Sequence, residues 1–234
     1  MSAETRFRRV PAAQLLAALA DHTEQELKLF RESWEDLPVD RYLPDVGDYR
    51  RRRYGRFAGV ERMTEQSGAT FCQTSEVNAL NGGVPRDFPP LAAELTRPGG
   101  VLRSLVRELA DLLPGPFDRD RGGVGVHQVR ITAGRGGRGL PTPEGVHEDG
   151  HHFVAQVFLG RHGVAGGVSR IYDRERRPLL ATTLTEPFEA LVIDDRRVYH
   201  SVDPIEPAAG YDRGGRDMLL VDFFPLDDGT RAHV

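Results

Sequence analysis

The sequence predicts an α+β domain in which N-terminal helices cover one face of an antiparallel β-sandwich or barrel. Helical periodicity is confined to the first half of the chain, whereas short β-rich runs separated by Gly, Pro and Asp fill it from Val124 onward. Strands and helices do not alternate as a parallel βαβ fold requires. With 234 residues and 39% hydrophobic content, we expect one domain over residues 1–234. Its part at about 1–115 is helical with some strands, and its main β core spans about 124–226.

Two segments have the residue spacing of amphipathic helices. The first runs from about Pro11 to Arg31 and breaks around residues 21–23; its apolar positions are Leu15, Leu16, Leu19, Leu27 and Phe30. The second runs from about Pro89 to Leu113 and is interrupted by the Pro-Gly-Gly of residues 98–100. Its apolar stripe consists of Leu91, Leu95, Leu102, Leu105, Val106 and Leu109.

Short apolar and β-branched runs predict the strands. Seven of them follow the helical part, at residues 124–132, 152–160, 166–173, 179–184, 188–195, 197–205 and 217–224. Two further candidate strands, 54–62 and 68–77, precede the second helical segment. We expect residues 134–139 (GRGGRG) to form a mobile loop. This spacing is typical of an antiparallel architecture.

Composition limits the chemistry and the partners. The net charge of -4 provides no general attraction to nucleic acid, so we expect no such partner. No stretch approaches the roughly 20 apolar residues that span a bilayer, and no signal-peptide run is present, so we expect a soluble, cytoplasmic protein without membrane contact. Cys72 is the only cysteine and Lys28 the only lysine, which disfavours disulfides, thiolate zinc sites and Schiff-base chemistry.

A candidate metal site lies in the segment Pro141–His152. His147 and Asp149 are two residues apart, so their side chains project from the same face of an extended chain. His200, 51 residues after Asp149 on another predicted strand, is the candidate third ligand. Two histidines and one carboxylate suit non-haem iron(II) that must also bind a co-substrate and dioxygen. These three residues are therefore the predicted metal ligands and catalytic centre.

Arginines near this site are candidates to bind a carboxylate, because the planar guanidinium matches that anion. Arg216 directly precedes the predicted strand 217–224 and is the preferred residue, with Arg213 as the alternative. Arg130 is a third candidate for the co-substrate or substrate carboxylate, and a structural ion pair is its alternative role. Gln128 shares the strand face of Arg130 and is a candidate to line the same pocket.

A resemblance to a known family rests on four segments: PTPEGVHEDG, GGVSRIYD, ALVIDDRRVYHSVDPI and RDMLLVDFF. They resemble the bacterial Fe(II)/2-oxoglutarate-dependent dioxygenases that include the isoleucine dioxygenases, which hydroxylate free aliphatic amino acids. The similarity extends over about Val124 to Phe224, and over YRRRRYGRF. It implies a double-stranded β-helix (jelly-roll, cupin-like) and iron(II) on the three predicted ligands. It also implies 2-oxoglutarate on Arg216, with O2 as the oxidant.

Several nearby residues have more than one interpretation. His151 and His152 are alternative metal ligands, although a bend at Gly150 favours contacts around the site instead. The pair Asp194 and Asp195 is either a solvated turn or an acceptor that orients His200. The arginines of residues 50–53 form either the solvated basic face of a strand or, if Arg52 turns inward, a site for an α-carboxylate. Core packing is expected for Trp34, Phe30 and, within a strand, Cys72.

The predicted function is hydroxylation of an unactivated C–H bond of a free L-amino acid, coupled to decarboxylation of 2-oxoglutarate to succinate. One alternative keeps this chemistry and changes the substrate to a tethered or peptidic natural-product intermediate. The other is a cupin-like module that binds metal or senses a ligand without turnover. The partner is thus a small molecule, and a homodimer is left open.

Overall fold

The computed structural model describes residues 6–43, 47–66, 68, 70–77, 80 and 82–226. Its central element is a seven-stranded sheet in which all neighbouring strands are antiparallel. The order across this sheet is β1 (Phe7–Val10), β9 (Ala190–Asp194), β5 (Phe153–His162), β12 (Arg213–Pro225), β4 (Gly122–Gly134), β2 (Arg50–Ala58) and β3 (Thr64–Glu65).

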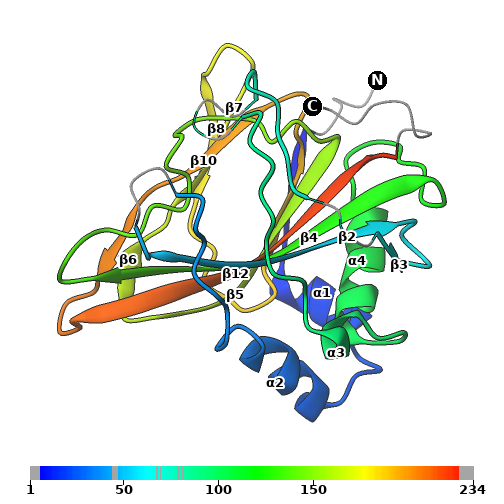
Figure 1. Cartoon of the computed structure of the whole chain (residues 1–234), viewed down its shortest axis with the longest axis horizontal. Helices are drawn as coiled ribbons and strands as arrows, with labels where there is room; N and C mark the ends of the chain where they lie inside the picture. Colours follow the sequence, from blue (N-terminus) through cyan, green and yellow to red (C-terminus); the bar gives the residue numbers. More distant parts are fainter. Residues whose placement is uncertain are drawn as a thin grey trace.

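Two smaller antiparallel sheets lie over one face of the large sheet (Figure 1). One has the order β10 (Tyr199–Val202), β7 (Ser169–Tyr172) and β8 (Pro178–Thr182), and the other pairs β11 (Ile205–Pro207) with β6 (Val164–Gly166). Together the sheets form the predicted double-stranded β-helix.

Four helices cover the opposite face of the large sheet (Figure 1). They are α1 (Ala12–Ala18), α2 (Glu24–Glu32), α3 (Ala93–Thr96) and α4 (Val101–Asp111). The predicted breaks lie between α1 and α2 and between α3 and α4. A capping box starts α2, where the Thr23 hydroxyl accepts the Glu26 N–H and the Glu26 carboxylate accepts the Thr23 N–H. Among the described residues, every helix falls short of the length and apolarity needed to cross a bilayer.

The helix side of the sheet is a hydrophobic core. The buried stripe of α4 packs there against apolar side chains of β4, β5 and β12, and each fully buried aliphatic side chain contributes about 1.5–3 kcal/mol. Trp34 is also buried and donates its indole N–H to the Met218 carbonyl at 3.2 Å. The core positions predicted for Trp34 and Phe30 are confirmed.

Alternation along the strands separates the two faces of the sheet. On β4, Val124 and Val126 belong to the helix-side core, whereas Val129 and Ile131 pack with Ile205 of β11 inside the β-helix. The interior is therefore lined by alternate residues of the central strands.

One local prediction was wrong. Residues 68–77 contain only an isolated bridge between Phe71 and Arg86 in their described part, because no neighbouring strand pairs with them. Cys72 accordingly lies outside any strand and is half-buried. The segment 134–139, predicted as a loop, contains a tight turn in which Gly134 and Gly137 exchange backbone hydrogen bonds; its mobility stays a prediction.

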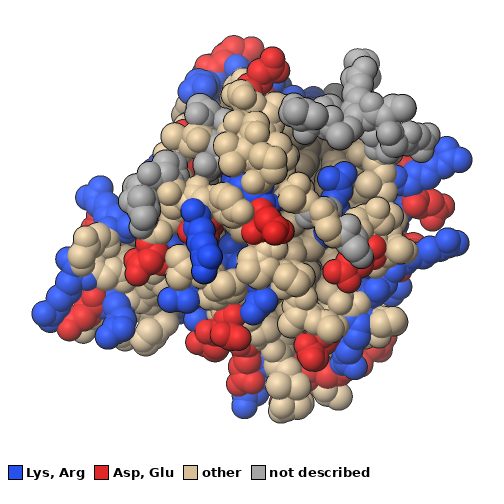
Figure 2. Space-filling model, in the orientation of Figure 1, with Lys and Arg blue, Asp and Glu red and all other residues tan. Residues whose placement is uncertain are grey.

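Acidic and basic side chains are interspersed on the face shown in Figure 2. Many of the exposed ones are paired, such as Arg174 with Glu148 at 2.6 Å and Arg138 with Glu206 at 2.6 Å. Pairs of this kind contribute little stability each, about 0–1 kcal/mol.

Candidate metal centre

The two histidines of the predicted triad are brought together by backbone pairing. His147 and His200 exchange both backbone hydrogen bonds, at 3.0 and 2.8 Å, and their ring centroids lie 4.4 Å apart. The Nδ1 of His147 lies 2.9 Å from the Gly145 carbonyl. An N–H on Nδ1 donated to that carbonyl leaves the Nε2 lone pair free to bind a metal.

Asp149 completes the cluster. Its Oδ2 lies 3.2 Å from Nε2 of His200 and its Oδ1 lies 3.6 Å from Nε2 of His147. One ligand atom from each of the three residues lies within 4.8 Å of the others. The structure therefore groups all three predicted ligands around one point.

The titration behaviour of this cluster follows from the close contacts. Burial alone would raise the pKa of Asp149, but hydrogen bonds from His147 and His200 hold it well below its ordinary value. Burial opposes a charge on His147, yet the Asp149 carboxylate raises the pKa of His147 to about 9. The negative charge of the Asp149 carboxylate thus favours a cation among the three side chains.

A buried carboxylate holds the loop that carries Asp149. Asp195 is fully buried, and its Oδ2 accepts the backbone N–H groups of Asp149, Gly150 and His151 at 2.8–3.0 Å. Gly150 has φ +80°, and a Cβ there would lie 3.0 Å from Val77, so glycine suits this turn. Burial and the Asp149 charge raise the pKa of Asp195 to about 6.

Asp194 and Asp195 have different roles. Asp195 lies 3.7 Å from Nδ1 of His200, which is too far for a hydrogen bond, so it orients the Asp149 loop rather than the imidazole. Asp194 is bonded by Arg196 at 2.9 and 3.0 Å instead. Neither carboxylate belongs to a solvated turn, since both are buried.

The predicted alternative ligands lie elsewhere. The His151 ring turns to Asp222, with Nε2 3.4 Å from Oδ2, and packs near Phe224. Burial and the charge of Arg196 lower the pKa of His152, whose ring lies near Phe153. Neither side chain is part of the described cluster of metal-ligand candidates.

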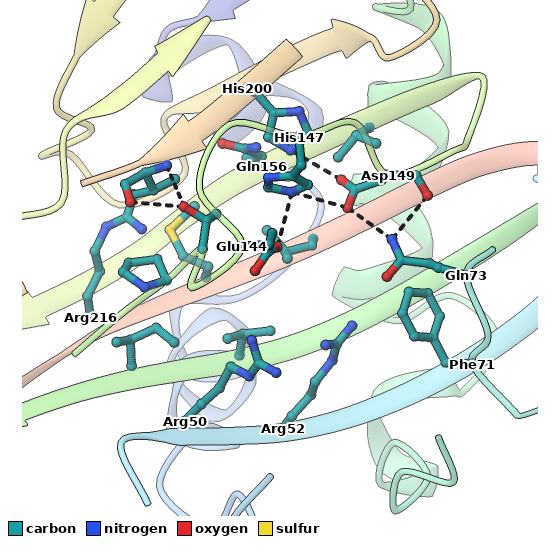
Figure 3. A pocket seen from close by; sticks show the side chains of 18 of the residues that line it. Arg50, Arg52, Phe71, Gln73, Glu144, His147, Asp149, Gln156, His200 and Arg216 are labelled. Carbon is teal, nitrogen blue, oxygen red and sulfur yellow. Dashed lines mark hydrogen bonds and ion pairs between the residues drawn. The ribbon is translucent and has the colours of Figure 1, made fainter. Parts of the chain in front are cut away.

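A cavity opens beside the three ligands (Figure 3). Its apolar wall comes from β4, β10 and β12, and its polar wall carries arginine, glutamine and glutamate side chains. Its lining includes Arg50, Arg52, Phe71, Gln73, Arg86, Val129, Ile131, Glu144, Met218, Leu220 and Arg216.

Arg216 enters this cavity from β12. It is 2% exposed, and its Nε and Nη2 have no hydrogen-bond partner among the described residues. Burial and the charge of Arg161 lower the pKa of Arg216 to about 10, so it is cationic at neutral pH. Gly167, with φ +72°, leaves room for it, because a Cβ there would lie 3.3 Å from the Arg216 side chain. Burying an unpaired cation is unfavourable in free energy, unless an anion binds it.

The other two arginine candidates do not reach the cavity. Arg213 is exposed at the start of β12, and Arg130 is bound by Asp217 and Glu35 on the helix-side face of β4. Gln128 shares that face and donates to the Ser33 hydroxyl. The structural ion pair is thus the role that the structure gives Arg130.

The arginine run on β2 alternates between faces. Arg50 and Arg52 are buried and line the cavity, whereas Arg51 and Arg53 donate to backbone carbonyls on the other side of the strand. A fully solvated basic face was therefore the wrong interpretation, and Arg52 does turn inward. Figure 3 shows Arg50 and Arg52 on the wall opposite His147.

Sequence reasoning missed Gln73, Arg86 and Glu144 as residues of this cavity. Gln73 donates to the carbonyl and Oδ1 of Asp149 at 3.1 and 3.4 Å, and accepts from Arg86 at 2.7 Å. The first two lie in or near the segment misread as a strand. Glu144 stands three residues before His147, and that spacing was the available signal.

A family model described as 2OG-Fe dioxygenase matches residues 31–222. The chain belongs to this family. The cofactors are therefore Fe(II), 2-oxoglutarate and O2, and the chemistry of the His-Asp-His cluster fits the metal. No curated protein matches the chain.

Solved structures share the fold of this chain. A bsmA homologue from Methylobium petroleophilum PM1 is 31% identical, with 95% of this chain and 89% of that chain covered and a TM-score of 0.83. IDO from Bacillus thuringiensis is 21% identical, with 95% of both chains covered and a TM-score of 0.77. The Fe(II)/α-ketoglutarate-dependent dioxygenase TqaL is 16% identical, with 94% and 83% covered and a TM-score of 0.67. They confirm the predicted fold, without distinguishing an isoleucine dioxygenase group.

Proposed function

We propose that this dioxygenase hydroxylates an unactivated C–H bond of a free L-amino acid and converts 2-oxoglutarate to succinate and CO2. The observation that carries the proposal is the presence, in one cavity, of three convergent ligand candidates and of the buried Arg216, which has no carboxylate partner among the described residues. The three ligand candidates suit the metal, and the buried arginine suits the dicarboxylate 2-oxoglutarate.

His147, Asp149 and His200 would hold iron(II) through two imidazole nitrogens and one carboxylate. Iron(II), when bound, supplies the activation of O2 that the cleavage of an unactivated C–H bond requires. The protein's task is to keep the three ligands in place, which Asp195 does through the backbone of the Asp149 loop.

Arg216 would pair with the carboxylate of 2-oxoglutarate that lies away from the metal. Its guanidinium is positioned by packing between β12 and Gly167 and faces no competing carboxylate among the described residues. Val129, Met218 and Leu220 line the same cavity and limit the access of water to it.

A free amino acid suits a cavity that combines charged and apolar walls. A tethered or peptidic intermediate is the alternative substrate for the same chemistry. A module without turnover has no use for the buried cation of Arg216 and is not favoured. We also propose that residues 1–234 form a single domain; the cytoplasmic location and a homodimer stay predictions.

Anaerobic titration of the iron(II)-loaded protein with 2-oxoglutarate tests the cofactor site. We expect a visible metal-to-ligand absorption band that is lost in His147→Ala. Arg216→Met should require about 10- to 100-fold more 2-oxoglutarate, because a charge-assisted hydrogen bond contributes about 1.5–3 kcal/mol. Arg213→Met is the matched control on the same strand and should titrate normally. A normal band in His147→Ala would overturn the ligand assignment.

Incubation with a panel of L-amino acids, 2-oxoglutarate and air tests the substrate class. We expect succinate together with an amino acid that gains one oxygen atom by mass spectrometry. A panel that gives neither product, combined with hydroxylation of a carrier-bound or peptidic substrate, would favour the alternative.

A further inference from the structure

Three buried arginines, Arg50, Arg52 and Arg86, line the cavity, and Arg50 is the one with a carboxylate partner among the described residues. Arg50 donates to the buried Asp40 carboxylate at 2.6 Å. Arg52 and Arg86 are 8% and 2% exposed and form no ion pair among the described residues. This wall therefore carries two positive charges in excess.

Arg52 is oriented by a neutral group. Its Nε and Nη2 lie 3.2 and 2.7 Å from Nδ1 of His127, whose Nε2 lies 2.8 Å from Asp222. Burial and the Arg52 charge lower the pKa of His127 to about 4, so the ring is neutral at physiological pH. The Nδ1 acceptor thus positions the guanidinium without cancelling its charge.

Arg86 lies against the same aromatic surface. The Phe71 ring centroid is 5.0 Å from the guanidinium carbon of Arg52 and 4.6 Å from that of Arg86. Arg86 donates to Gln73, and its Nε has no hydrogen-bond partner among the described residues. Phe88, 4.5 Å from Arg52, adds a further aromatic contact. Both guanidinium groups therefore contact one aromatic ring and line the same cavity.

The cofactors do not account for these two charges. In the proposed function, one end of 2-oxoglutarate is bound at the metal and the other at Arg216, which lies on a different strand. Arg52 and Arg86 remain without an anion. Two unpaired cations in a buried wall are costly, so a second anionic ligand is expected there.

Glu144 provides the opposite charge in the same cavity. Among the lining residues, the carboxylates are Glu144 and Asp149, and Asp149 belongs to the ligand cluster. Glu144 lies 3.4 Å from Nε2 of His147 and has no arginine partner among the described residues. In Figure 3 it projects into the space between His147 and the arginine wall.

We propose that Arg52 and Arg86 bind the carboxylate of the primary substrate and that Glu144 binds its ammonium group, so that the enzyme recognises a zwitterionic α-amino acid. This inference rests on the proposed function and adds the residues that select the substrate. The apolar residues Val129, Ile131 and Leu220 of the same cavity provide the surface for an aliphatic side chain.

A ligand series on the unaltered enzyme tests the inference. The protein is loaded anaerobically with iron(II) and 2-oxoglutarate, and calorimetry identifies the tightest binder among the twenty L-amino acids. That amino acid is compared with its amide, which lacks the carboxylate, and with its deaminated acid, which lacks the ammonium group. We expect both analogues to bind about 10- to 100-fold more weakly, as for the loss of a charged hydrogen bond. Equal binding of the amide, or no binding of any amino acid, would overturn the inference.

Variants then assign the two ends of the ligand. Arg52→Met and Arg86→Met should each weaken amino-acid binding by about 10- to 100-fold. Glu144→Gln should weaken binding of the amino acid but not that of the deaminated acid. Arg53→Met is the matched control, because this neighbour on β2 donates to the carbonyls of Pro90 and Asp36 outside the cavity. Unchanged affinity in both arginine variants would contradict the assignment.

The iron–2-oxoglutarate absorption band distinguishes failure of the proposed function from failure of the substrate inference. Its absence from the unaltered protein would overturn the proposed function. Its presence without amino-acid binding would overturn only the substrate inference. The band should persist in Arg52→Met and Arg86→Met; if Arg52→Met does not fold, the ligand series on the unaltered enzyme and Arg86→Met still decide.

Discussion

The two faces of the seven-stranded sheet treat polar side chains differently. Arg216 and Asp217 are adjacent on β12. The Nε and Nη2 of Arg216 have no hydrogen-bond partner among the described residues, whereas Asp217 is bound by Arg130 at 2.6 and 2.8 Å on the helix side. Gln128, also on the helix side, has a hydrogen bond to Ser33. On the cavity side, Arg52 and Arg86 have no carboxylate partner among the described residues.

The helix side of the sheet mainly stabilises the fold, whereas the cavity side is suited to bind ligands. Buried polar groups are normally satisfied within a protein, because an unsatisfied one costs about 1–3 kcal/mol. On the helix side, the charged groups of Arg130 and Asp217 neutralise each other beside a large apolar core. The cavity side leaves guanidinium groups for ligands. Changes on the helix side should therefore alter stability, and changes on the cavity side should alter binding.

The largest effect is expected in the helix-side core. Leu105 is fully buried, so Leu105→Ala should lower the free energy of unfolding by about 2–5 kcal/mol, measured by urea denaturation. Leu29→Ala, on an exposed position of α2, should change it by less than about 0.5 kcal/mol. The iron–2-oxoglutarate band of folded Leu105→Ala should stay normal. Loss of this band in the folded variant would show that the two faces are not separable.

The loop that carries Asp149 provides the next test. Asp195→Asn replaces one of the oxygens that accept backbone N–H groups and should lower iron(II) affinity by about 10- to 100-fold. Asp194→Asn is the control, since its carboxylate is bonded to Arg196 instead. Competition with a chelator measures both affinities. Equal affinities in the two variants would remove Asp195 from the metal site.

Acid should destabilise the metal-free protein through His127. Its pKa of about 4 in the fold lies below the ordinary value of 6.5. Below pH 6.5 the unfolded chain binds a proton that the folded ring does not, so this contribution is complete above pH 6.5 and is lost as the pH falls towards 4. Between these two pH values, the free energy of unfolding falls by at most about 1.4 kcal/mol per pH unit as the pH is lowered. Urea denaturation of the protein and of His127→Gln, with NMR titration of the ring, measures it. A ring pKa near 6.5 would contradict the neutral acceptor that orients Arg52.

The smallest effect is expected for the paired arginine on the helix side. Arg130→Met should cost about 1 kcal/mol or less, because its ion pairs with Asp217 and Glu35 are partly exposed. The 2-oxoglutarate titration should not change. If Arg130→Met needs a higher concentration of 2-oxoglutarate in this titration, Arg130 would again be a candidate to bind the cofactor.

Local spacing was sufficient for several features of this protein. The helical stripes, the strand runs after Val124, and the family segments are short-range patterns, and each follows from periodicity or motif. The proximity of His147 and Asp149 is of the same kind, since a single residue separates them in the sequence. The sequence by itself therefore determined the fold class, the family and the core of the candidate ligand set.

Only the tertiary structure decided which residues share the cavity. Period-two alternation predicts which side chains lie on one face, but not which face is interior. Arg216 was the preferred candidate and Arg130 a third one, and strand pairing placed them on opposite sides of the sheet. His200 reaches Asp149 through a bridge between segments far apart in the chain. Arg86 and Phe71 enter the site from a segment without sheet partners, where no periodic pattern indicates their direction. Long-range pairing, rather than local preference, thus assembled the arginine wall opposite the metal ligands.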